Sequence, residues 1–372
     1  MTLAIHELLT SNEHLSKEID DFLYRSRFPL VEGRDTTFVF RGAVDAVRLQ
    51  HWCYGLSNGQ SFIRIGQSDL WFTVLKLPIG SRIEYKIEVL RGNHGEWILD
   101  PLNPNFATDP FGANSVCFGP GYSPPEWCFA KSNVEGGTVE EHIMDSKAFG
   151  DSRRFLVYLP ARYSEQRTYP VLVAHDGEDY LRFSELKNVL DNLIDSKRIP
   201  PIIAILSNPG ARLVEYAASE PHAQHMVEEL IPWVEERYSI GREPKDRWLM
   251  GASFGAVATI GTAWRFPGFF SGLILQSGSF VPTSTEIVQR GPEFEPVIHF
   301  LDGFRKLPGA PAKRIFVSCG LFETLIPGNR EMVQILRQQG IQVRYIEAYD
   351  GHHWQNWRDR LKDGLVWLSS LV

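Results

Sequence analysis

The chain has 372 residues, of which 43% are hydrophobic and 22% charged, and its formal net charge is −7. This length and composition indicate a globular protein with a large core, most naturally built from two domains. The acidic balance and the lack of a basic block argue against a nucleic-acid partner. No apolar run approaches the roughly 20 residues of a membrane span, and the first residues lack the pattern of a signal peptide. We therefore expect a cytoplasmic protein with no membrane partner.

The four cysteines, Cys53, Cys117, Cys128 and Cys319, are widely spaced and form no C-x-x-C pair. This spacing favours neither a metal site nor a disulfide framework. We therefore expect reduced thiols and no metal or other cofactor.

Residues 1–30 have weak amphipathic spacing and are predicted to be a helical segment. Residues 31–120 change to short alternating strands, most clearly over 82–89, where apolar and charged side chains alternate. Such a run of strands predicts an immunoglobulin-like β-sandwich. It contains Trp52, Trp71 and Trp97, which we expect in its core, although a surface row of them could bind a sugar or another flat ligand.

Residues 121–137 are predicted to be a linker, because the glycines and prolines around Gly119-Pro120-Gly121 and Ser123-Pro124-Pro125 cannot continue a sheet. Residues 138–372 then alternate apolar strand-like runs with helical spacing. This alternation predicts an α/β domain with a mostly parallel, doubly wound sheet. Residues 281–311 show little periodicity, and we expect an inserted loop there that could act as a lid.

The α/β region is organised around Gly251-Ala252-Ser253-Phe254-Gly255, a G-x-S-x-G sequence between a strand-like run and a run of small residues. In this context the motif predicts a strand–turn–helix elbow that exposes a strained nucleophilic serine, Ser253. The N–H of Phe254 then lies at a helix N-terminus, where it can stabilise an oxyanion. The alternative is an ordinary strand-to-helix turn.

A nucleophilic serine needs a base, and the base needs an acid to hold its tautomer. In an α/β-hydrolase these follow in the order Ser, Asp or Glu, His, each after a strand. Glu323 follows the predicted strand 314–318, and His352 follows the predicted strand 343–346. We predict that Glu323 is the acid and His352 the base.

Three neighbours compete for these roles. His353 is the alternative base, although it is one residue further from the turn glycine. Asp350 and Asp302 are alternative acids; the first is too near His352 along the chain, and the second lies in the 281–311 insertion. A histidine pair that only caps the last helix is the structural alternative.

The loop after the apolar run 171–174 is expected to supply the second oxyanion donor, and we place it at the N–H of Glu178, with Gly177 allowing the turn. Arg212 could recognise an acidic or phenolate substrate, or form a structural pair with Glu215. Trp354 and Arg358, beside the predicted base, are candidate substrate-binding residues.

A series of motifs occurs in order along residues 138–372: Asp176-Gly177, Arg212-x-x-Glu215-Tyr216, Gly251-x-Ser253-x-Gly255, Gln276-Ser277-Gly278-Ser279-Phe280, Gly320-x-x-Glu323 and Gly351-His352-x-Trp354-x-x-Trp357-Arg358. Together they resemble the esterase D-like α/β-hydrolase family. That family contains enterochelin (ferric siderophore) esterases, feruloyl and acetylxylan esterases, and mycolyltransferases. In the front part, Trp71, Asp100-Pro101-Leu102-Asn103-Pro104 and Pro124-Pro125-x-Trp127 resemble the N-terminal domain of the enterochelin esterases.

The resemblance implies Ser253 as nucleophile, His352 as base, Glu323 as acid, and oxyanion donors at Phe254 and around Glu178. One departure is Asp350-Gly351-His352-His353, where the family often has two glycines, a histidine and an aspartate. The expected function is a serine carboxylesterase that hydrolyses a siderophore ester, releasing iron. A feruloyl or acetyl-carbohydrate esterase and a non-catalytic binding protein on the same fold are the alternatives. The expected partner is a small-molecule ester, and a homodimer is left open.

Overall fold

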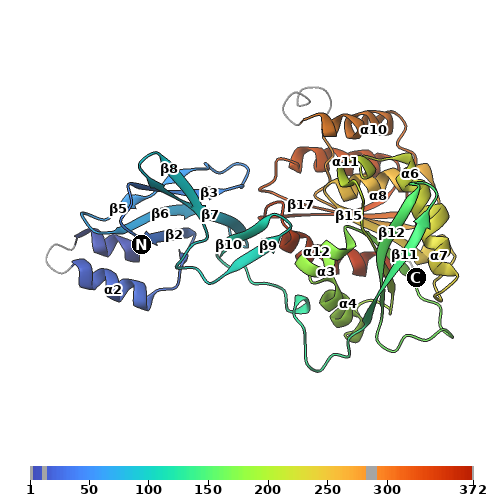
Figure 1. Cartoon of the computed structure of the whole chain (residues 1–372), viewed down its shortest axis with the longest axis horizontal. Helices are drawn as coiled ribbons and strands as arrows, with labels where there is room; N and C mark the ends of the chain where they lie inside the picture. The colour runs from blue at the N-terminus through green and yellow to red at the C-terminus, as the bar shows by residue number, and fades with distance from the viewer. Residues whose placement is uncertain (1–2, 11–14, 282–290, 371–372) are drawn as a thin grey trace. The chain divides into compact units, whose positions relative to one another are not determined.

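A computed structural model of the chain describes residues 3–10, 15–281 and 291–370 (Figure 1). By its contacts the chain forms two compact units. The first comprises Met1–Ser123 together with two short segments, Leu321–Glu323 and Ala348–His353. The second comprises Pro124–Gly320, Thr324–Glu347 and Trp354–Val372. The two segments that carry Glu323 and His352 thus group with the first unit, which the predicted boundaries 31–120 and 138–372 do not anticipate.

Among the described residues of the first unit, two antiparallel sheets and three short helical segments form its main part. One sheet has the order β1-β2-β6-β5; the other has the order β4-β3-β7-β10-β9, with β8 paired to β7. The helical segments are α1 (Ala4–Glu7), η1 (Leu8–Thr10) and α2 (Leu15–Arg25). The strands are β1 (Leu30–Glu32), β2 (Asp35–Arg41), β3 (Ala46–His51), β4 (Gln60–Ser61), β5 (Ile63–Arg64), β6 (Leu70–Lys76), β7 (Arg82–Arg91), β8 (His94–Ile98), β9 (Phe106–Asp109) and β10 (Gly112–Phe118).

The side chains of strand β2 explain why the N-terminal helices pack against the first sheet. Phe38 and Phe40 belong to the cluster between the sheets, whereas Val39 belongs to a second cluster with Ile5 and Ile19 of the helices. Successive strand residues point to opposite faces, so both faces of β2 are buried. The predicted helical segment therefore covers the outer face of the first sheet.

The three tryptophans of the sandwich differ in burial. Trp71 is 7% exposed and its indole N–H donates to the Gly42 carbonyl over 3.1 Å, so the core prediction is confirmed for Trp71. It is wrong for Trp52 and Trp97, which are 49% and 47% exposed and meet edge to face with their rings 6.2 Å apart.

The second unit is built on an eight-stranded sheet with the order β11-β12-β14-β13-β15-β16-β17-β18. Strands β13 to β17 pair in parallel, whereas β11 and β12 pair in antiparallel fashion at one side. The strands are β11 (Thr138–Ser146), β12 (Asp151–Leu159), β13 (Val171–His175), β14 (Ile203–Ser207), β15 (Arg247–Ala252), β16 (Gly272–Gln276), β17 (Arg314–Gly320) and β18 (Gln342–Ala348).

Helices cover both faces of this sheet (Figure 1). Along β13, Val171 and Val173 join the cluster under one set of helices, and Leu172 and Ala174 join the cluster under the other. The first set is α6 (Glu220–Gln224), the π-helical η3 (His225–Leu230), α7 (Ile231–Glu235), α8 (Phe254–Arg265), α10 (Glu295–Lys306) and α11 (Ile326–Gln338). The second set is α3 (Gly177–Phe183), α4 (Leu186–Asp195) and α12 (Trp354–Ser369). The predicted α/β architecture with a doubly wound, mostly parallel sheet is confirmed.

Short helical pieces complete the second unit: α5 (Arg212–Glu215), η2 (Glu126–Cys128), η4 (Pro244–Asp246) and η5 (Pro292–Phe294). The expectation of an irregular loop over 281–311 is wrong for Glu295–Lys306, which is helix α10. Its buried residues Val297, Leu301 and Phe304 do have helical spacing, but Pro296 and Gly303 interrupt the sequence pattern. The rest of the lid hypothesis falls largely on 282–290, which lie outside the described residues.

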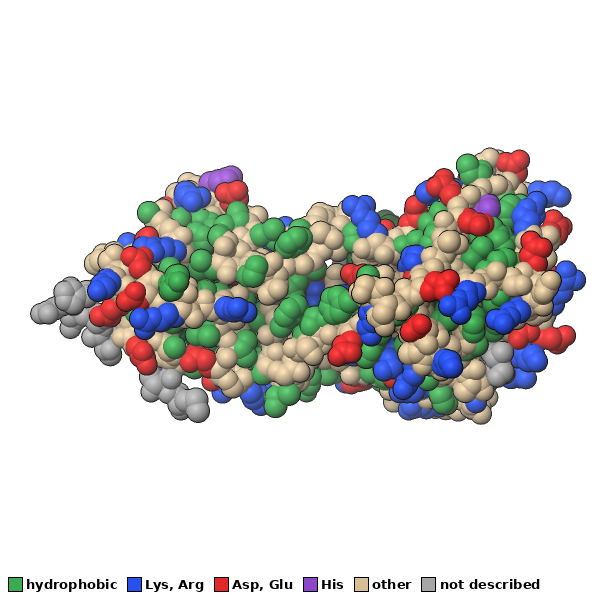
Figure 2. All heavy atoms as spheres, turned by 90° about the horizontal axis from the view of Figure 1, so that it is seen from below, with side chains coloured by type: hydrophobic (Ala, Val, Ile, Leu, Met, Phe, Trp, Pro, Cys, Tyr) green, Lys and Arg blue, Asp and Glu red, His purple; other side chains and the backbone are tan. Residues whose placement is uncertain are grey.

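Among the described residues, no helix has both the length and the apolar character needed to cross a bilayer. Side chains of both signs are interspersed on the face drawn in Figure 2, and neither sign forms a continuous stripe among the described residues of that face.

Candidate active site

Ser253 occupies the turn between β15 and α8. Its backbone has φ 57° and ψ −121°, a conformation that L-residues rarely adopt. Its N–H donates to the Gln276 carbonyl over 2.9 Å, which ties the turn to the end of β16. A Cβ at Gly251 would collide with the Gly255 carbonyl oxygen, so this approach of strand and helix requires glycine. The predicted elbow is therefore present, with the strain located at the serine itself.

The Ser253 side chain is next to the turn that follows β16. Its Oγ is 3.3 Å from Ser279 Oγ, and the Ser279 N–H donates to the Ser253 carbonyl over 3.2 Å. Ser253 is the N-cap of α8 and Phe254 is the first helical residue. The first N–H groups of a helix have no intrahelical acceptor, so the Phe254 N–H is suited to bind a negative oxygen.

The structure brings Glu323 and His352 together. Glu323 Oε2 is 2.7 Å from His352 Nδ1; the Glu323 side chain is 1% exposed, whereas the His352 side chain is 40% exposed. His353 takes a different direction, with Nδ1 3.5 Å from Glu84 Oε2. The arrangement is a buried carboxylate bonded to Nδ1 of a largely accessible imidazole.

The two competing acids have other partners. Asp350 accepts a hydrogen bond from Arg82 over 3.3 Å, and both side chains are buried. Asp302 lies 3.4 Å from Arg305, one turn further along α10. Glu323 lies 2.7 Å from His352 Nδ1, and we retain it as the proposed acid.

The loop after β13, which we predicted to supply the second oxyanion donor, has its left-handed residue at a position other than the expected one. The left-handed residue is Asp176, with φ 52°, rather than Gly177. Gly177 is required for another reason, because a Cβ there would collide with the backbone of Leu206 in β14. The Glu178 N–H donates to Asn208 Oδ1 over 3.1 Å. This N–H therefore serves as an oxyanion donor only if a substrate oxygen replaces the Asn208 amide.

Arg212 is bound to this same loop. Its Nε and Nη2 donate to the two carboxylate oxygens of Asp176 over 2.8 and 2.7 Å. Burial alone would lower the pKa of Arg212, but its bonds and charge contact with Asp176 hold the pKa raised. The structural alternative of an Arg212–Glu215 pair is wrong, because Glu215 pairs with Arg153 over 2.8 Å.

Trp354 and Arg358 are both engaged inside the second unit. The Trp354 ring packs edge to face against Tyr180 and Trp357, with centroids 5.2 and 4.7 Å away. The Arg358 guanidinium is 3.0 Å from both Glu185 and Asp359, and the side chain is 8% exposed. These contacts account for both side chains, and we carry neither forward as a substrate-binding residue.

Sequence reasoning missed a buried histidine pair behind the elbow. His175 Nδ1 is 2.9 Å from the Met250 carbonyl, and its Nε2 is 2.9 Å from His222 Nε2. A carbonyl only accepts, so Nδ1 of His175 carries the proton and its Nε2 accepts from His222. Burial lowers the pKa of His175 to about 4 and lowers that of His222 as well. The only signal in the sequence is a histidine that ends an apolar strand.

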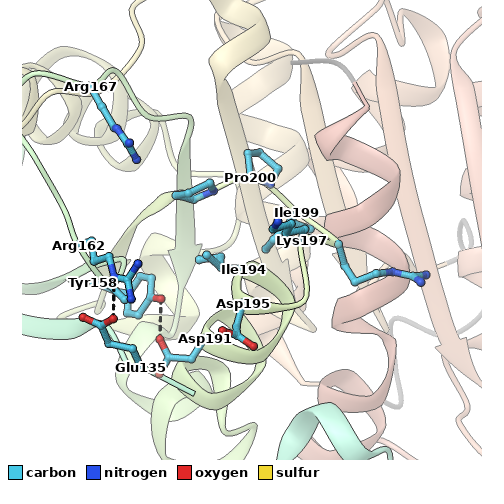
Figure 3. A pocket seen from close by; sticks show the side chains of 13 residues that line it. Glu135, Tyr158, Arg162, Arg167, Asp191, Ile194, Asp195, Lys197, Ile199 and Pro200 are labelled. Carbon is cyan, nitrogen blue, oxygen red and sulfur yellow. Dashed lines mark hydrogen bonds and ion pairs between the residues drawn. The ribbon is translucent and has the colours of Figure 1, made fainter. Parts of the chain in front are cut away.

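The structure also contains a cavity of about 630 Å³ away from the elbow (Figure 3). It is bounded by residues that follow β12, such as Arg162, by the end of α4, and by Pro200 and Pro201 before β14. Strand β12 is antiparallel to β14, so this is the edge where the parallel strands begin. Ser253 follows the other end of β15, and the cavity therefore does not belong to the elbow.

The fold and the elbow define an α/β-hydrolase with a β-rich domain in front. The chain belongs to the family described as putative esterase, whose pattern matches residues 146–368. It is 25% identical over 239 residues to the uncharacterized protein YjcH of Bacillus subtilis, covering 62% of this chain and 97% of that protein.

Two solved structures share the fold. The enterobactin esterase of Shigella flexneri, determined in the presence of enterobactin, is 21% identical, with a TM-score of 0.73 over 90% of this chain and 92% of the other. A ferulic acid esterase from Anaeromyces mucronatus, in complex with ferulic acid, is 18% identical, with a TM-score of 0.52 over 66% of this chain and 95% of the other. The first likeness extends over both units, whereas the second covers about the length of the α/β region.

Proposed function

We propose that this protein is a serine esterase in which Ser253 is the nucleophile, His352 the general base and Glu323 the acid that orients the base. The observation that carries the proposal is the strained backbone of Ser253 at the N-cap of α8. The 2.7 Å contact between Glu323 and His352 supports it, because an ester-cleaving serine requires such an oriented imidazole. The three residues follow strands β15, β17 and β18 of one sheet.

The proposed reaction proceeds through an acyl-enzyme. His352 Nε2 takes the proton of Ser253 Oγ as this oxygen attacks the ester carbonyl carbon. The Phe254 N–H, with a second donor that we place near Glu178, binds the oxygen that becomes negative. His352 then gives its proton to the leaving alcohol and removes one from the water that releases the acid. Each oxyanion donor is worth about 3 kcal/mol of transition-state stabilisation by precedent.

The proposed substrate is a siderophore ester. The likeness to the Shigella enterobactin esterase extends over 90% of the chain, and that protein was determined with enterobactin present. A feruloyl ester is the second candidate, supported by the likeness to the Anaeromyces ferulic acid esterase. An inactive binding protein would not need the strain at Ser253, because a turn that merely connects a strand and a helix can adopt ordinary torsion angles.

The experiment that separates these functions is a comparison of kcat/KM for ferric enterobactin and methyl ferulate with the same purified protein. A preference for ferric enterobactin supports the siderophore proposal, and a preference for methyl ferulate overturns it. p-Nitrophenyl acetate serves as a substrate with no recognition groups. Turnover of none of the three by a folded protein contradicts the esterase proposal itself.

A further inference from the structure

A buried cluster of charged side chains lies inside the first unit, beside the segment that carries His352. Arg82 in β7 donates from Nη2 to Glu84 Oε1 over 2.7 Å and from Nη1 to Asp350 Oδ1 over 3.3 Å. The three side chains are 2%, 3% and 1% exposed. Charged groups are rarely buried this completely unless they are paired. The three groups meet this condition by pairing with one another, and the pairing joins β7 to the segment that carries His352.

Arg82 contacts the 348–353 segment with its backbone as well as its side chain. Its N–H donates to the Tyr349 carbonyl over 2.9 Å. Asp350, which receives the Arg82 side chain, also accepts from the Gly351 N–H over 2.7 Å with the same Oδ1. The carboxylate of Asp350 thus links the guanidinium to the turn immediately before His352.

The segment that carries Glu323 is joined to the same turn. The Phe322 N–H donates to the Asp350 carbonyl over 3.1 Å, and the Leu321 N–H donates to the Ala348 carbonyl over 2.7 Å. The Tyr54 N–H of the sandwich donates to the Phe322 carbonyl over 2.8 Å. Arg82 is therefore hydrogen-bonded to Asp350. Asp350 in turn is hydrogen-bonded to the segment that carries Glu323 and lies in the segment that carries His352.

Glu84 completes the cluster on its other side. Its Oε2 accepts from Asn114 Nδ2 over 2.9 Å and is 3.5 Å from His353 Nδ1. Burial alone would raise the pKa of Glu84, but His353 and Arg82 hold it lowered, so the carboxylate is charged. The pairing with Glu84 fixes the guanidinium plane, which a flexible cation on the surface would not achieve.

We propose that Arg82 is a positioning residue of the esterase: through Asp350 it holds the turn that presents His352 to Glu323. The inference rests on the proposed function, in which His352 is the base. It gives the β-sandwich an indirect part in catalysis, through its support of the segment that carries His352. The proposed role requires an arginine at position 82, because one planar guanidinium makes separate hydrogen bonds to Glu84 and to Asp350.

The test compares Arg82→Met and Arg82→Lys in the full-length protein, with Arg48→Met as the matched control. Arg48 is an arginine of the same sandwich, paired with Glu88 at 3.6 Å, but its side chain is 45% exposed and lies on β3. We expect Arg82→Met to lower kcat for p-nitrophenyl acetate by about 10- to 100-fold, because small displacements of a catalytic group cost on the order of 100-fold. KM should change much less, Arg82→Lys should recover part of kcat, and Arg48→Met should behave as the wild type.

A second readout follows the hydrogen bond itself. A proton held between His352 Nδ1 and Glu323 should give a low-field proton NMR signal, assigned by its loss in His352→Ala. Arg82→Met should weaken or remove this signal, and a folded variant with unchanged signal and unchanged kcat overturns the inference. If Arg82→Met does not fold, Asp350→Asn is tested instead by kcat and by the low-field NMR signal. The asparagine side chain has the volume of the aspartate but not the charge that pairs with Arg82.

The two proposals fail in different ways. Full turnover by Ser253→Ala or His352→Ala overturns the serine esterase function, whatever Arg82 does. Loss of turnover in those variants, with wild-type kcat and NMR signal in Arg82→Met, leaves the function intact and rejects the positioning role.

Discussion

Glu323 and His352 are separated by 28 intervening residues and a complete helix, yet the Glu323 carboxylate lies 2.7 Å from the His352 imidazole. The buried carboxylate faces one ring nitrogen of a half-exposed histidine. Such a pair selects the tautomer in which the other nitrogen accepts a proton.

Replacement of Ser253 by alanine should abolish turnover of p-nitrophenyl acetate, by on the order of a millionfold in kcat. The variant should fold normally, because only one hydroxyl is lost from a site where Oγ has a 3.3 Å contact with Ser279. Ser279→Ala is the matched control and should retain most activity. Esterase assays and circular dichroism measure both, and substantial turnover by Ser253→Ala would show that the nucleophile lies elsewhere.

Glu323→Gln should lower kcat by about 10³- to 10⁴-fold, since an amide can hold the wrong tautomer of His352 in place of the right one. KM should be little changed. The control is Asp302→Asn, which alters the competing carboxylate on α10. A strong loss with Asp302→Asn and a near-normal rate with Glu323→Gln would exchange the two assignments.

Gly251→Ala should destabilise the protein by about 1–3 kcal/mol, because the new Cβ would collide with the Gly255 carbonyl and overpack the elbow. Gly303→Ala is the control, since Gly303 lies in helix α10 with open space where a Cβ would be. That substitution should stabilise by up to about 1 kcal/mol through the unfolded state. Urea unfolding measures both, and equal effects of the two substitutions would contradict the close approach.

The free energy of unfolding should fall as the pH drops from about 6.5 toward 4, in part because of the buried histidines His175 and His222. His175 has its pKa lowered to about 4 by burial, so below 6.5 the unfolded chain binds a proton that the folded chain refuses. The contribution of neutral, buried His175 to the free energy of unfolding is fully present above pH 6.5 and is lost as the pH falls to about 4. It amounts to about 3 kcal/mol for His175 alone. Urea unfolding at several pH values measures it.

A variant pair isolates this contribution from other titrating groups. His222→Asn removes one buried imidazole and should flatten part of the decline below pH 6.5. The matched control is His94→Asn, which alters an exposed histidine of β8. Identical pH curves for wild type and His222→Asn would mean that the buried pair contributes nothing.

Local patterns in the sequence were sufficient to predict the elbow, the parallel strands around it and the order of the catalytic candidates, but not strand β11. The apolar run 171–175 followed by helical spacing predicts a buried strand, and the glycines at 251 and 255 allow the close approach of strand and helix around Ser253. The prediction of structure failed where burial depends on distant partners. The neighbouring sequence of Trp52 and Trp97 is typical of core strands, but the tertiary arrangement leaves both side chains exposed.

Side-chain pairing was the least predictable part of the site. Arg212 could have met Glu215 three residues along the chain, but it pairs with Asp176, which is 36 residues away. Nothing in the local pattern indicates which carboxylate a given arginine meets, because the two segments are brought together by the sheet. The same holds for Arg82 and Asp350, which are 268 residues apart.

The grouping of Ala348–His353 with the sandwich has a consequence for how such proteins can be rearranged. A gene fusion that exchanged residues 1–123 for another front domain would leave the chain of the α/β region intact but remove Arg82, Glu84 and Tyr54. The turn that carries His352, the proposed base, would then need new hydrogen-bond partners from the incoming domain. We therefore expect residues 1–123 and the segment Ala348–His353 to be inherited together, although they are far apart in the sequence.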